Sequence, residues 1–108
     1  MHIQTLSADY GISGQIQPDD VRVAAQAGYK TIVCARPDNE SWGQPSYSDI
    51  SRVAEQFGIK TVYLPVSGAA TANQVAQFKA MCRDVGKPVL GYCRSGARAA
   101  TLYNESRR

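Results

Sequence analysis

The chain has 108 residues, of which 44% are hydrophobic and 19% charged, with 12 Lys and Arg against 9 Asp and Glu. This composition predicts one compact domain over residues 1–108 and excludes an intrinsically disordered chain. The formal net charge of +3 is too small for a dedicated nucleic-acid-binding domain. No apolar run approaches the roughly 20 residues that cross a bilayer, and the first residues lack the pattern of a secretion signal. We therefore expect a cytoplasmic protein without nucleic-acid or membrane partners.

The first third of the chain predicts two short extended pieces, a helix and a strand. Residues 3–15, interrupted by Gly11 and Gly14, are typical of a strand that turns back on itself. Residues 18–28 follow with apolar positions on one helical face, acids at the start and a glycine at the end. Residues 31–35 are a β-branched, apolar run and predict a buried strand.

The same order of elements repeats twice more. Residues 46–58 predict a second helix and residues 59–64 a second buried strand. Residues 71–86 predict a third helix, followed by an apolar strand at residues 88–93. A fourth helix is expected to begin after Gly96.

This alternation predicts an α/β fold with a parallel central sheet of four to five strands and helices on both faces. In such folds the working site lies at the carboxyl ends of the strands. That rule selects the loops at residues 36–44, 65–70 and 93–98. We expect the active loop to be the last of these, between the final strand and the helix that follows it.

Residues 93–98 read Cys-Arg-Ser-Gly-Ala-Arg, a short loop in which a cysteine precedes a helix. Successive backbone amides and the helix N-terminus make such a loop an anion cradle, and the same positive field favours the thiolate of Cys93. Arg98 supplies a two-pronged donor, so Cys93 and Arg98 are the predicted catalytic residues. The predicted substrate-binding or anion-binding residues of this loop are Arg94, Ser95, Gly96 and Ala97.

Two residues of the loop at 36–44 are further candidates. Arg36 is expected to bind the substrate anion, and Asp38 to act as an auxiliary acid or to orient an arginine through a salt bridge. We interpret Cys34 as a buried packing residue and not as a second, resolving thiol of the site. Cys82 is expected to lie in the core. The single histidine, His2, has no partner nearby in the sequence, so we expect no metal site and no cofactor.

The Cys-x4-Arg loop resembles the active loop of rhodanese-type sulfurtransferases. The order of elements, together with residues 14–15, 34–40, 44–45 and 64–66, resembles a bacterial beta-lactamase-hydrolase-like, rhodanese-related family with a protein-tyrosine-phosphatase-like fold. The resemblance implies either sulfur transfer or phosphate hydrolysis. It also implies partners such as a persulfide dioxygenase or a sulfide:quinone reductase.

Two features of the sequence favour sulfur transfer. The active loop of tyrosine and dual-specificity phosphatases has the pattern Cys-x5-Arg. In this chain Ala99 stands at the arginine position of that pattern, and Arg98 comes one residue earlier. Residues 65–70, where such enzymes carry an acidic residue, contain no carboxylate. We therefore expect Cys93 to form a persulfide, taking sulfur from thiosulfate or glutathione persulfide and passing it to a thiol or sulfite.

Two alternatives stay open on the sequence. The first is a cysteine-dependent tyrosine or dual-specificity phosphatase with a phosphocysteine intermediate, and the second is a non-catalytic module that binds an anion or a redox partner. The distribution of charge agrees with an anionic ligand in each case, since residues 79–108 hold seven basic and two acidic side chains.

Overall fold

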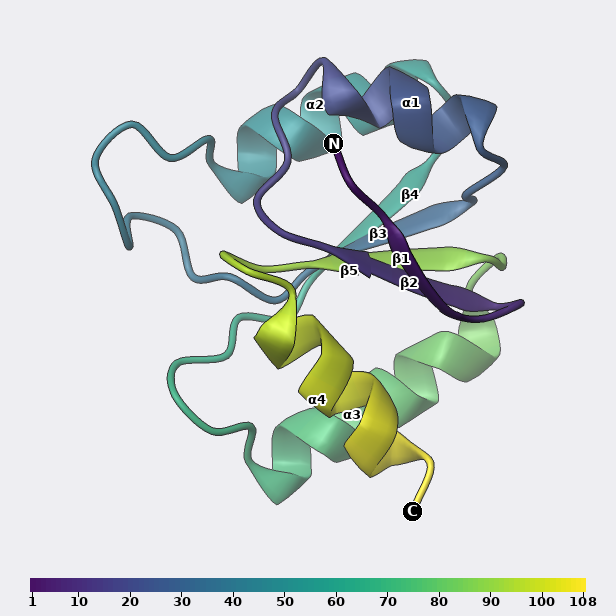
Figure 1. Cartoon of the computed structure of the whole chain (residues 1–108), viewed down its shortest axis with the longest axis vertical. Helices are drawn as coiled ribbons and strands as arrows, with labels where there is room; N and C mark the ends of the chain where they lie inside the picture. Colours follow the sequence, from purple (N-terminus) through teal and green to yellow (C-terminus); the bar gives the residue numbers. More distant parts are fainter.

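The computed structural model describes residues 1–108, with five strands and four helices that alternate along most of the chain (Figure 1). The elements are β1 (Gln4–Ser7), β2 (Tyr10–Ser13), α1 (Asp20–Gln26), β3 (Thr31–Cys34), α2 (Tyr47–Gln56), β4 (Lys60–Tyr63), α3 (Ala72–Asp84), β5 (Val89–Tyr92) and α4 (Ala97–Ser106). None of the helices is both long and apolar enough to cross a membrane.

The strands form one sheet in the order β1-β2-β5-β3-β4. β2, β5, β3 and β4 are parallel, and β1 pairs antiparallel with β2 as the outer arm of a hairpin. The predicted α/β class is confirmed, with the hairpin adding one antiparallel edge strand. β5 occupies the centre, where it pairs with β2 on one side and β3 on the other, so all four of its residues are buried.

The helices cover both faces of the sheet in two pairs. α1 and α2 lie on one face, and α3 and α4 lie on the other (Figure 1). Side chains of a strand alternate between the two faces, so one strand contributes to two cores. Along β5, Val89 belongs to the core beneath α3 and α4, whereas Leu90 and Tyr92 belong to the core beneath α1 and α2.

The starts of two helices follow directly from local sequence. Ser46 and Thr71 precede α2 and α3, and each accepts a hydrogen bond from the backbone three residues on while the side chain there accepts one in return. These capping boxes satisfy amides that the first helical turn leaves without partners. The predicted helix starts at 46 and 71 are therefore confirmed.

The three loops selected from the sequence leave the sheet at the same end, on the left in Figure 1. They connect β3 to α2, β4 to α3 and β5 to α4. Because parallel strands end together at one edge, residues that are far apart in the chain meet there.

Phe78 on α3 offers a test of this packing. Its side chain is fully buried and meets the ring of Tyr10 edge-on, with ring centroids 5.4 Å apart. We expect Phe78→Ala to lower the free energy of unfolding by about 3–5 kcal/mol, because it leaves a cavity between α3 and the sheet. Urea denaturation measures the change. The matched control is Phe57→Ala at a 43% exposed position, and an equal loss in both variants would contradict the packing described.

Candidate functional site

The loop after β5 places the sulfur of Cys93 at the N-terminus of α4. The Cys93 side chain is buried, and the backbone amide of Gly96 donates to its Sγ atom at 3.1 Å. The donated N–H and the positive end of the helix both stabilise negative charge on sulfur. Cys93 is therefore the candidate nucleophile of this loop.

Gly96 has a conformation that few other residues adopt easily. Its φ is +96°, and a side chain there would meet the Ser13 carbonyl oxygen at 3.4 Å. The residues after β2 support the loop from the same direction, because the amide of Gln15 donates to the Arg94 carbonyl at 3.1 Å. The chain thus turns tightly into α4 against the end of β2.

Arg98 joins the three loops. Its guanidinium donates to both carboxylate oxygens of Glu40, at 2.7 and 2.9 Å, and to the carbonyl of Val66 at 2.7 Å. Glu40 belongs to the β3–α2 loop and Val66 to the β4–α3 loop. The bonds to Glu40, with a further contribution from the sulfur of Cys93, raise the pKa of Arg98. Arg98 is held as a cation beside Cys93.

Glu40 also accepts from Arg36, and this second arginine is almost wholly buried. The Arg36 Nε atom lies 2.9 Å from Glu40 Oε1, and its other nitrogens donate to Gln15 and Ser41 at 3.0 and 2.9 Å. Hydrogen bonds from Arg98 and Arg36 lower the pKa of Glu40 to about 2. Glu40 is a carboxylate fixed between two guanidinium groups.

The structure places two predicted residues differently from the expectation. Arg36 directs its donors to protein groups, so it acts on the loop through Glu40 in place of contacting an anion directly. Asp38 forms no ion pair with an arginine; its Oδ1 accepts from the Tyr47 amide at 2.8 Å, at the start of α2. The carboxylate that orients Arg98 is Glu40. It lies in the loop at residues 36–44 that the sequence selects, but the sequence predicts no role for it.

The other predicted loop residues lie at the mouth of the site. Arg94 and Ser95 are exposed, and the Ser95 hydroxyl accepts from the amide of Ala97 at 3.3 Å. Arg94 forms no ion pair, in contrast to Arg98. It is the cation of this loop that stays free for an outside anion.

Cys34 lies in the opposite core from Cys93. It packs beneath α1 and α2, where its thiol donates to the Arg36 carbonyl at 3.2 Å and burial raises its pKa. Cys93 packs beneath α3 and α4. The sheet separates the two sulfurs, so Cys34 is a packing residue and is not placed to form a disulfide with Cys93.

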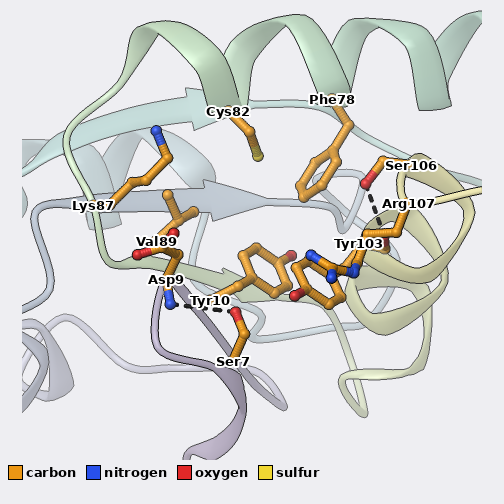
Figure 2. A pocket seen from close by; sticks show the side chains of 10 residues that line it. All are labelled: Ser7, Asp9, Tyr10, Phe78, Cys82, Lys87, Val89, Tyr103, Ser106 and Arg107. Atoms are coloured by element: carbon orange, nitrogen blue, oxygen red, sulfur yellow. Dashed lines mark hydrogen bonds between the residues drawn. The ribbon is translucent and has the colours of Figure 1, made fainter.

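A cavity of about 410 Å³ adjoins Arg98, between the β4–α3 loop and α4. Its lining is Val66, Gly68, Ala69, Ala70, Ala97, Arg98, Thr101 and Glu105. A second cavity, of about 170 Å³, lies at the other end of the strands, where Tyr10 begins β2 and Val89 begins β5 (Figure 2). Only the first contains a residue of the active loop, so it is the candidate space for a substrate.

The Glu40 carboxylate predicts a dependence of stability on pH. Its folded pKa of about 2 lies below the ordinary value of 4.5, so its contribution is complete above pH 4.5 and is lost as the pH falls toward 2. We expect Glu40→Gln to be less stable than the natural chain by about 1 kcal/mol at neutral pH, because solvent weakens the ion pairs of an exposed carboxylate, and we expect the difference to shrink below pH 4.5.

Urea denaturation at pH 7, 5, 4 and 3 measures this difference. The control is Glu55→Gln, because Glu55 is exposed and forms no ion pair. A difference between the natural chain and Glu40→Gln that stays constant from pH 7 to pH 3 would show that the ionised carboxylate does not stabilise the fold.

Comparison with known proteins assigns this arrangement to a family. The family model of the "Beta-lactamase hydrolase-like protein, phosphatase-like domain" matches residues 2–107. A beta-lactamase hydrolase-like protein of Agrobacterium fabrum is 34% identical over 93 residues, which are 85% of this chain and 22% of that protein. The corresponding protein of Xylella fastidiosa (strain 9a5c) is 32% identical over 104 residues, 95% of this chain and 24% of its own.

Solved structures agree with this family. A "putative phosphatase" of Neisseria meningitidis has a TM-score of 0.88 at 34% identity, over 95% of this chain and 74% of that one. A "putative phosphatase" of Shewanella putrefaciens has a TM-score of 0.81 at 26% identity, over 97% and 66%. PTPMT1 has a TM-score of 0.77 at 12% identity, which is a likeness of fold alone.

These comparisons overturn the predicted function. The family is phosphatase-like and the similar structures carry the name phosphatase, so the prediction of a rhodanese-like sulfurtransferase with a persulfide on Cys93 is wrong. The prediction rested on loop spacing and on a missing acid. Loop spacing alone does not identify the chemistry of the site: Gly96 turns the chain into α4 in a left-handed conformation, and the family is phosphatase-like.

The match extends over almost the whole chain, although the chain spans only about a quarter of the curated relatives it resembles. The shared part includes the active loop, the hairpin and all four helices. The chain belongs to the phosphatase-like domain family of the beta-lactamase hydrolase-like proteins.

Proposed function

We propose that this domain is a cysteine-dependent phosphatase that forms a phosphocysteine intermediate on Cys93. The observation that carries the proposal is the buried sulfur at the N-terminus of α4, with the Gly96 amide 3.1 Å away. A thiolate so placed lies beneath amides that suit the oxygens of a phosphoryl group. The family and the similar structures support the same chemistry.

The first step transfers the phosphoryl group to sulfur. The Cys93 thiolate attacks phosphorus, a sulfur–phosphorus bond forms, and the bond from phosphorus to the leaving oxygen breaks with its electron pair on that oxygen. The loop amides stabilise the charge on the equatorial oxygens in the transition state, and Arg98 adds to this through its Nε, which none of its bonds to Glu40 and Val66 uses. Arg94, exposed and unpaired, is available to attract the anion.

The second step restores the enzyme. Water attacks phosphorus, loses a proton to solvent, and displaces the Cys93 thiolate as the sulfur–phosphorus bond breaks, which releases inorganic phosphate. Glu40 keeps Arg98 in one orientation through both steps, because its two oxygens match the two-pronged guanidinium.

Substitution of the nucleophile tests this function. With 4-nitrophenyl phosphate, we expect Cys93→Ser to lower kcat by at least about 1,000-fold, because the hydroxyl is not ionised at neutral pH. Arg98→Lys keeps the charge but loses the two-pronged geometry, and we expect a loss of about 100-fold. Steady-state release of 4-nitrophenol measures both values.

Cys82→Ser is the matched control, because Cys82 lines the cavity at the far end of the strands and should leave turnover near that of the natural chain. If the natural chain releases no phosphate from any phosphomonoester but binds phosphate as tightly as Cys93→Ser does, the domain is an anion-binding module and the proposal is wrong.

A further inference from the structure

The positions of the carboxyl groups around the active loop narrow the class of substrate. We propose, on the basis of the phosphatase function above, that this site hydrolyses phosphates whose leaving group departs as a stable anion without receiving a proton from the protein. Acyl phosphates, phosphoanhydrides and esters of acidic phenols belong to this class, and alkyl phosphates do not.

Proton donation matters because the leaving oxygen takes the electron pair of the broken bond. A simple alkoxide is strongly basic and a poor leaving group, so a positioned acid speeds its departure by about 100-fold to 10,000-fold. A carboxylate, a phosphate or the anion of an acidic phenol needs little such help. The class of substrate therefore depends on whether a protonated group can reach the leaving oxygen.

Glu40 is the carboxyl group in direct contact with Arg98, and it holds no proton to give. Its Oε1 accepts from Arg36 and Arg98, and its Oε2 accepts from Arg98. These bonds lower its pKa to about 2, so it is ionised throughout the neutral range. Glu40 positions Arg98 and takes no part in proton transfer.

Asp38 is bound to a different part of the molecule. Its Oδ1 accepts from the Tyr47 amide at the start of α2, and its backbone amide donates to the Tyr63 hydroxyl at 2.9 Å. Tyr63 ends β4, the edge strand, which is two strands away from β5. These two bonds tie Asp38 to the start of α2 and to the end of β4, and neither partner belongs to the loop that holds Cys93 and Arg98.

The cavity beside Arg98 offers space for a leaving group but no nearby acid. Its walls next to Arg98 carry small side chains from the β4–α3 loop and α4, and the Thr101 hydroxyl already donates to the Ala97 carbonyl. Its one carboxyl group, Glu105, follows Arg98 by seven residues, about 10 Å along the helix. Glu105 also pairs with Arg108 at 2.7 Å.

A series of leaving groups tests the inference on the natural chain. We would measure kcat/KM for 4-nitrophenyl phosphate, phenyl phosphate, acetyl phosphate and glycerol phosphate. We expect phenyl phosphate to react at least about 100-fold more slowly than 4-nitrophenyl phosphate, glycerol phosphate to be slower still, and acetyl phosphate to be among the best. Similar values for all four would overturn the inference and leave the phosphatase function intact. No turnover of any of them would overturn both.

Two variants test whether either of the remaining carboxyl groups near the site donates a proton to the leaving group. Asp38→Asn keeps an oxygen for the Tyr47 amide, and Glu105→Gln keeps the shape of the cavity wall. We expect each variant to preserve the ratio of phenyl to 4-nitrophenyl phosphate turnover. A selective loss of phenyl phosphate turnover in either variant would identify that carboxyl group as the proton donor and overturn the inference.

Discussion

The carboxylate of Glu40, held between Arg98 and Arg36, is the interaction on which the geometry of the site depends. It connects the β3–α2 loop to the first turn of α4, and through Arg98 it reaches the Val66 carbonyl of the β4–α3 loop. A buried guanidinium without an anionic partner is strongly unfavourable, so Arg36 and Glu40 stabilise each other. Three loops that are distant in the chain therefore meet around a single arginine.

The central position of β5 explains why the backbone around Cys93 is so firmly held. Strands pair with β5 on both sides, which leaves its backbone little freedom, and Cys93 follows its last residue directly. Alternation of side chains then assigns Cys93 to the core beneath α3 and α4, and Cys34 to the other core. The same alternation keeps the two thiols apart, which separates the candidate nucleophile from the packed Cys34.

The lack of a protonated carboxyl group near Arg98 has a different meaning in the folded molecule than in the bare sequence. In the sequence, residues 65–70 contain no carboxylate, which favours chemistry that needs no acid, such as sulfur transfer. In the structure the carboxyl groups are present but assigned to other tasks: Glu40 orients Arg98, and Asp38 accepts from the first turn of α2. Breaking a phosphorus–oxygen bond remains possible with such a site, provided that the leaving group is a weak base.

Residues close together in the chain are enough to predict the order of elements, the two capped helices and the loop that holds Cys93 and Arg98. Glu40 lies in one of the loops that the sequence predicts at the site, yet its role depends on Arg98, 58 residues later. Only tertiary structure brings such residues together, since it is strand pairing that aligns the ends of β3, β4 and β5. The same holds for Arg36: its type suggested an anion contact, whereas its burial against Gln15 and Ser41 made it a support for the active loop.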